Sequence, residues 1–144
     1  MSKIEVNAVE PQCGTTLTLG ASGDTVTLGS GASQSGFGRT GTVNWQTSIK
    51  TGDFTAANGE GYFVDTSSGA ITVTLPSSPS AGNIIAVKDY ANTADTNRIT
   101  IARNGSNIDG AAADGIVANE GGAVTLVFAD STKGWLVTDA AQKS

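Results

Sequence analysis

The pattern that most constrains the fold is an alternation of apolar and polar residues within residues 41–76. Over residues 43–50, Val43, Trp45 and Ile49 fall on one side of this alternation, and the run ITVTL at 71–75 repeats it. Side chains of a strand point alternately to its two faces, so each pattern predicts a strand with one face in a core. The apolar run YFV at 62–64 predicts a third strand between them, and we expect the three to form a meander.

Further strands are expected at residues 83–90, 98–103, 123–129 and 135–138, with short ones near residue 108 and at 116–117. Asn104-Gly105 is a strong hairpin signal. No segment is a convincing helix, because Gly110 and Gly115 interrupt the Ala-rich stretch 111–118. This spacing predicts an all-β chain folded as an antiparallel β-sandwich or jelly roll. We expect its core to hold Trp45, Phe63, Ile71, Val73, Leu75, Ile85, Val87, Ile99, Ile101, Leu126, Phe128 and Trp135.

The segment before this domain contains a small internal repeat. TLTLGA at 16–21 is echoed by TVTLGS at 25–30, and GSGASQSGFG at 29–38 is typical of a linker. Two such short strands cannot bury an apolar face alone, so we expect them to pack on copies from other chains. The alternative is an ordinary hairpin packed on the main domain. The expected contacts for oligomerisation or attachment are Ile4, Val6, Leu17, Leu19, Val26, Leu28 and Phe37.

These patterns predict an N-terminal arm at 1–40 with a β-repeat and a linker, a β-sandwich at 41–138, and a loose tail at 139–144. The arm is expected to serve oligomerisation or attachment. Cys13 is the single cysteine, so no disulfide can form within one chain, and we expect a small buried thiol.

The charge of the chain argues against nucleic acid as a partner. The net charge is −5, the pI is about 4.4, and the 8 Lys and Arg residues are scattered singly. Binding to nucleic acid needs clustered basic residues that displace counterions. No apolar run approaches the roughly 18 residues of a membrane span. The opening MSKIEVNAVE lacks the pattern of a signal peptide, so we expect neither a membrane partner nor export.

Residues that carry chemistry are scarce, and we expect neither an enzyme nor a cofactor. The chain has no histidine, so it lacks the usual general base, triad partner and zinc ligand. A glycosidase pair would have to come from carboxylates in or beside turns, where structural use is the default: Asp53, Glu60, Asp65, Asp89 and Asp95. A calcium site would use loop carboxylates without any fixed spacing: Asp89, Asp95, Asp109 and Asp114. An exposed Tyr62 or Tyr90 would suit stacking on a sugar, although a tyrosine at the edge of the core is more common.

Several segments together resemble a β-domain of tailed-bacteriophage virion proteins, similar to those of phages of marine bacteria and cyanobacteria. They are GRTGTVNWQ at 38–46, GEGYFV at 59–64, SGAITVTLP at 68–76, AVKDY at 86–90, ITIARNGS at 99–106, VTLVF at 124–128 and GWLV at 134–137. GTTLTLGASGDTVT at 14–27 is similar to the lead-in of such proteins.

The resemblance implies a non-enzymatic virion structural protein, a homotrimer assembled in the host cytoplasm. The first expectation is a capsid decoration, or cement, protein that binds the major capsid protein and stabilises the head shell. An arm of some forty residues is too short for the long shaft of a fibre, at about 3.3 Å per residue. The alternative is a tail-fibre or receptor-binding module that binds another tail protein and the host surface. The third, an enzyme acting on surface polysaccharide, is the least favoured.

Overall fold

The computed structural model describes residues 42–141 and, before them, residues 9, 13–15, 18, 23–25 and 27. The chain divides into two units, Met1–Gly38 and Arg39–Ser144. All the strands described lie in the second unit. They are β1 (Asn44–Trp45), β2 (Phe54–Thr55), β3 (Glu60–Val64), β4 (Ile71–Thr74), β5 (Ile84–Asp89), β6 (Ile99–Ala102), β7 (Gly115–Val117), β8 (Ala123–Asp130) and β9 (Gly134–Ala141). Residues 42–141 contain no helix, and the predicted all-β class is confirmed.

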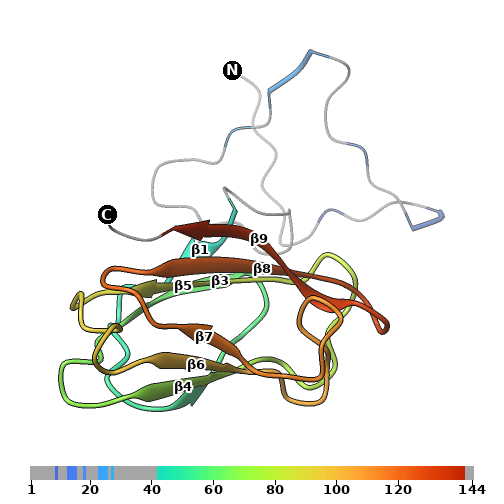
Figure 1. The fold of residues 1–144 in the computed structure, drawn as a ribbon. Coiled ribbons are helices and arrows are strands. Elements are labelled where there is room, and N and C mark those ends of the chain that lie inside the picture. The colour runs from blue at the N-terminus through green and yellow to red at the C-terminus, as the bar shows by residue number, and fades with distance from the viewer. Residues whose placement is uncertain are drawn as a thin grey trace. The chain divides into compact units, whose positions relative to one another are not determined.

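The strands form two sheets that face each other across one core, as in a β-sandwich (Figure 1). The five-stranded sheet has the order β1-β3-β5-β8-β9, and the four-stranded sheet has the order β2-β4-β6-β7. From β1 to β6 the chain alternates between the sheets, and each strand pairs in parallel with the strand two places earlier. The chain therefore winds as three stacked coils, β1–β2, β3–β4 and β5–β6. The antiparallel strands β7, β8 and β9 complete both sheets.

The expected antiparallel meander over residues 41–76 is wrong. Its strands β1 and β3 pair in parallel, and β4 belongs to the opposite sheet. Parallel neighbours need a long crossover, and here each crossover includes a strand of the other sheet. Alternation in the sequence reports which face of a strand is buried, not the direction of its neighbour. A winding chain and a meander therefore produce the same pattern.

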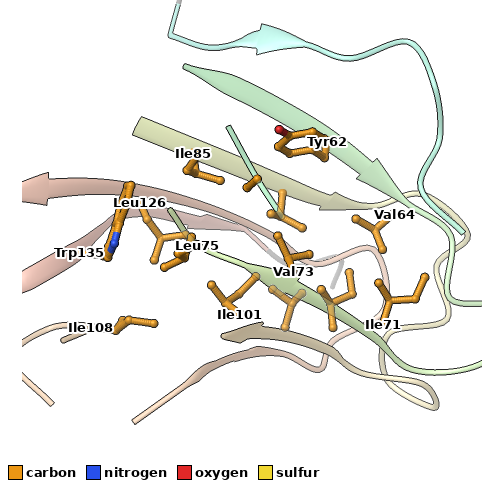
Figure 2. Packing of buried hydrophobic residues seen from close by; sticks show 14 of the residues in the cluster. Tyr62, Val64, Ile71, Val73, Leu75, Ile85, Ile101, Ile108, Leu126 and Trp135 are labelled. Carbon is orange, nitrogen blue, oxygen red and sulfur yellow. The ribbon is translucent and has the colours of Figure 1, made fainter. Parts of the chain in front are cut away.

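The core lies between the two sheets (Figure 2). Val73 and Leu75 from the four-stranded sheet and Ile85 from the five-stranded sheet are fully buried, and Trp135 fills the end of the core beside Ile108 and Leu126. Each such side chain contributes about 1.5–3 kcal/mol to folding. Ten of the twelve predicted core residues are buried: Ile71, Val73, Leu75, Ile85, Val87, Ile99, Ile101, Leu126, Phe128 and Trp135.

The remaining two predicted core residues lie on the outer face of the five-stranded sheet. Trp45 is 44% exposed and Phe63 is half-buried, because Tyr62 and Val64, the neighbours of Phe63, take the inward positions of β3. This outer face also carries a second apolar cluster. It consists of Val43, Ile84 and Ala86, with Val127 packed against them.

Three local features differ from the sequence expectations. β9 runs to Ala141, so residues 139–141 belong to a strand and not to a loose tail. β2 was not predicted, because two residues are too few to show a period. Asn104 and Gly105 adopt positive φ angles of 48° and 93° in a tight turn, but the antiparallel partner of β6 is the later strand β7. The prediction of a tight turn at Asn104-Gly105 is therefore confirmed, but the prediction that this turn joins two paired strands is wrong.

Candidate functional site

The predicted oligomer or virion contacts all lie outside the described residues: Ile4, Val6, Leu17, Leu19, Val26, Leu28 and Phe37. Their role stays a prediction. Cys13 is described, and its thiol is free and exposed. The expected burial of this thiol is therefore wrong.

Three of the five carboxylates proposed for a glycosidase pair, Asp53, Asp65 and Asp89, accept hydrogen bonds from backbone amides. The Asp53 Oδ1 accepts the amide of Thr72 at 2.7 Å, which ties the start of β2 to β4. The Asp65 Oδ1 accepts the amide of Ser67 at 2.9 Å. Hydrogen bonds from the hydroxyl and the amide of Ser67 lower the pKa of Asp65, because they stabilise its charged form. The Asp53 and Asp65 carboxylates thus act as turn and edge caps.

The carboxylates proposed for calcium are also used locally. The Asp109 Oδ1 accepts the amide of Val137 at 3.2 Å, and the Asp114 Oδ1 accepts the amide of Arg103 at 2.9 Å. Both contacts hold the long loop between β6 and β7. Within the described part of the chain, no group of three or more His, Cys, Asp or Glu residues is placed to hold a metal ion.

Asp89 is the one fully buried carboxylate among residues 42–141. Its Oδ2 accepts the amides of Ala94 at 3.1 Å and Gly121 at 3.0 Å. Next to it, the Lys88 ammonium donates to the carbonyl of Gly121. Asp89 therefore joins the loop after β5 to the turn before β8, while its Oδ1 has no hydrogen-bond partner.

Two aromatic pairs lie on the opposite faces of β3. On the outer face, Trp45 stacks on Phe63, with the ring centroids 4.9 Å apart and the planes at 24°. On the inner face, Phe54 lies against Tyr62 with centroids 4.7 Å apart. The Lys50 ammonium stands 5.3 Å from the centroid of the Phe54 ring and 5.8 Å from that of Tyr62, which suits a cation–π contact.

Tyr62 is held by two hydrogen bonds as well as by packing. Its hydroxyl donates to the Glu60 Oε2 at 2.6 Å and accepts the amide of Ala57 at 2.7 Å. Burial, with a smaller effect of the Glu60 carboxylate, raises the pKa of Tyr62 to about 12. Because only 3% of this residue is exposed, Tyr62 is a core residue and not a stacking platform for a sugar.

Among residues 42–141, the exposed aromatic side chains are those of Trp45 and Tyr90. Tyr90 is 54% exposed and lies just after β5. The Trp45 ring lies close above Gly61, where a Cβ would stand 2.8 Å from its atoms. An indole that packs on Phe63 and Gly61 and is still 44% exposed is suited to stacking on an apolar side chain or a sugar ring.

Within the described part of the chain, the strands at the ends of both sheets have edges with backbone groups that no other strand fully covers. Among residues 42–141, β1, β2 and β7 each pair with one neighbouring strand, whereas Trp135 near the start of β9 also bonds to the backbone of Asn107 and Asp109. A groove of about 390 Å³ lies between β7 and β9, flanked by the exposed side chains of Ile116 and Val137. Such edges and grooves are where one β protein contacts another. Sequence reasoning could not find them, because an edge strand has the same alternation as a central strand.

A comparison with models of known protein families finds no match for this chain. No curated protein matches its sequence either. Within the described residues, no helix has the length and apolar character needed to cross a membrane.

Proposed function

We propose that this chain is a non-enzymatic structural protein of a tailed-bacteriophage virion that decorates the head shell as a homotrimer. Its partners are copies of itself and the major capsid protein, which the N-terminal arm contacts. The proposal rests on the resemblance of the segments named above. The structural observation that supports it is the division of the chain into an N-terminal unit, Met1–Gly38, and a second unit with a sandwich core of its own.

The geometry suits a component that reinforces a shell. Main-chain hydrogen bonds join the three coils. They form parallel ladders that connect β1, β3 and β5 in one sheet and β2, β4 and β6 in the other. The side chains of Asp53, Asp89 and Asp114 add cross-links to the loops between them. Weak contacts from each arm would add up when several copies engage the shell together.

A second candidate function is supported by the exposed aromatic groups. The exposed side chains of Trp45 and Tyr90 suit stacking on glycans, as expected of a receptor-binding module at the tail. In that case the partner would be another tail protein, with the host surface as the target.

Immunogold electron microscopy of intact virions, with an antibody against this chain, tests both candidates. Label spread over the head supports decoration, and label confined to the tail supports the receptor-binding module. Label absent from the particles, with this chain present in the infected-cell lysate, would overturn both.

A chain that lacks residues 1–38 is the matched variant. We expect it to keep the circular dichroism spectrum of the sandwich and to lose its place on the particles. If the shortened chain decorates virions as fully as the complete one, the assignment of attachment to the arm is wrong.

A further inference from the structure

Four sites among residues 42–141 have a glycine directly after an Asn or Asp, and the structure holds them differently. They are Asn58-Gly59, Asn104-Gly105, Asp109-Gly110 and Asp114-Gly115. At such a site the glycine amide nitrogen can attack the side-chain carbonyl carbon of the preceding residue, because glycine has no Cβ in the way. Hydrogen bonds that hold both groups prevent this attack unless the chain opens locally.

Asn58 and Gly59 are both bound to Ile84. The Asn58 Oδ1 accepts the Ile84 amide at 3.0 Å, and the Gly59 amide donates to the Ile84 carbonyl at 2.8 Å. Ile84 begins β5 and is buried. Both bonds must break before the Gly59 nitrogen can reach the Asn58 side chain. This site is therefore protected in the folded chain.

The two aspartate sites are held as well. Gly110 donates its amide to the Lys133 carbonyl at 2.8 Å, and Gly115 is the first residue of β7. The carboxylates of Asp109 and Asp114 accept backbone amides, as described above. A carboxylate is also a poorer target for a nucleophile than a neutral side-chain amide. Neither aspartate site is therefore expected to react in the folded chain.

Asn104-Gly105 differs from the other three sites. Both residues are exposed, with positive φ angles, and a Cβ at Gly105 would meet no atom within 4 Å. The Asn104 Nδ2 donates to the Leu75 carbonyl at 2.8 Å. Within the described part of the chain, the Gly105 amide donates no hydrogen bond and the Asn104 Oδ1 accepts none. The single hydrogen bond that holds this site leaves the attacking nitrogen free.

We propose that Asn104 is a site of spontaneous deamidation in the folded protein. The Gly105 nitrogen loses its proton and forms a bond to the Asn104 Cγ, while the bond from Cγ to Nδ2 breaks and the nitrogen leaves as ammonia. The product is a five-membered succinimide ring. Water then opens the ring at one of its two carbonyls, which produces either aspartate or isoaspartate at position 104.

The modification removes a hydrogen bond from the edge of the core. Leu75 is fully buried, and its carbonyl accepts the Asn104 side-chain amide. A carboxylate at position 104 cannot donate to that oxygen and repels it, so the carbonyl loses its partner. In the isoaspartate product the main chain also becomes one carbon longer within the turn after β6. Deamidation should therefore loosen this turn. This inference does not rest on the proposed function.

Mass spectrometry of the ageing full-length chain tests the proposal. The chain is kept in mildly alkaline buffer, sampled over days and digested with trypsin, which places Asn58 in peptide 51–88 and Asn104 in peptide 104–133. Fragment spectra assign each conversion of amide to acid to one residue. A parallel sample in concentrated urea is the matched control, because the two Asn-Gly sites then differ only in their flanking sequence.

We expect Asn104 to convert at least about tenfold faster than Asn58 in the folded chain, because Asn58 reacts only after local opening. In urea the two rates should converge. Equal rates in the folded chain would overturn the proposal. So would an Asn104 that keeps its amide when folded and loses it in urea, because the bond to Leu75 would then protect it. The aged chain and the variant Asn104→Asp should both have lower urea midpoints than the fresh chain, and unchanged midpoints would refute the loosened turn.

Discussion

The α-carbon of Gly134 lies directly against the main-chain carbonyl of Asn107, where a Cβ at position 134 would stand 1.9 Å from the oxygen. Gly134 has a φ of 74°, in the left-handed region, and begins β9. The next residue, Trp135, donates its amide to the same carbonyl at 2.8 Å. This contact fastens the loop between β6 and β7 to β9 and sets Trp135 in the core.

Gly134→Ala should therefore be among the most damaging small substitutions in the sandwich. The methyl group would displace Asn107, and the left-handed backbone would be strained. We expect the free energy of unfolding to fall by about 3 kcal/mol, measured by urea denaturation. Gly52→Ala is the control, because Gly52 has no atom near the position of a Cβ and no positive φ. Similar urea midpoints for the two variants would contradict the close contact.

Gly61→Ala tests the position of the Trp45 ring. A Cβ at Gly61 would lie 2.7 Å from the Val43 Cγ2 and 2.8 Å from two atoms of the Trp45 ring, so the indole must move away from Phe63. We expect a red shift of tryptophan emission and a loss of about 1–2 kcal/mol in unfolding free energy. Trp135 is fully buried and should keep its emission. Unchanged emission would show that the ring does not rest on β3.

Asp89→Ala tests the buried carboxylate. The amides of Ala94 and Gly121 would lose their acceptor inside the protein, and we expect a cost of about 3 kcal/mol. Asp89→Asn keeps an oxygen at this place and should cost less. The exposed Asp95 is the control, and its alanine variant should lie within about 0.5 kcal/mol of the unmodified chain. Faster hydrogen exchange at the amides of residues 94 and 121, confined to the Asp89 variants, would identify the lost bonds.

The raised pKa of Tyr62 predicts a loss of stability at high pH. The phenol has a pKa of about 12 in the folded chain and about 10 when unfolded, so folding favours its neutral form. Its contribution is fully present below about pH 10 and is lost as the pH rises through about 12. Urea midpoints measured from pH 8 to 12 should fall more steeply for the unmodified chain than for Tyr62→Phe. Parallel pH profiles for the two would refute this assignment.

The inward faces of the strands could be predicted from the sequence, because burial imposes a period of two. Val73, Leu75 and Ile101 were assigned to the core on that period alone, and all three are buried. Trp45 was assigned there on the same grounds and lies on the outer face instead. Near β1 the five-stranded sheet has apolar residues on both faces. The period of two therefore does not show which face of the strand points into the core and which carries the second cluster.

The pairing of strands and the contact surfaces could not be predicted in this way. Phe54 pairs with Val73 in parallel. The two residues are far apart along the chain, and no local sequence pattern indicates that they pair. Asp89 was a candidate for catalysis or calcium on the basis of its position near a loop. That its carboxylate instead accepts the amides of Ala94 and Gly121 depends on a turn some thirty residues away.

The winding of the chain also sets how fast it can fold. In the five-stranded sheet only β8 and β9 form a local hairpin, because β1, β3, β5 and β8 each pair with a strand that is distant along the chain. In domains with such distant pairings, the chain loses the entropy of loop closure before the stabilising contacts form. Such domains therefore fold in milliseconds to seconds. Trp135 enters the core from β9, the last strand along the chain, with its ring 5.6 Å from that of Phe128. Because Trp135 is fully buried, its fluorescence reports closure of the core, while Trp45 on β1 reports the parallel pairing of β1 with β3.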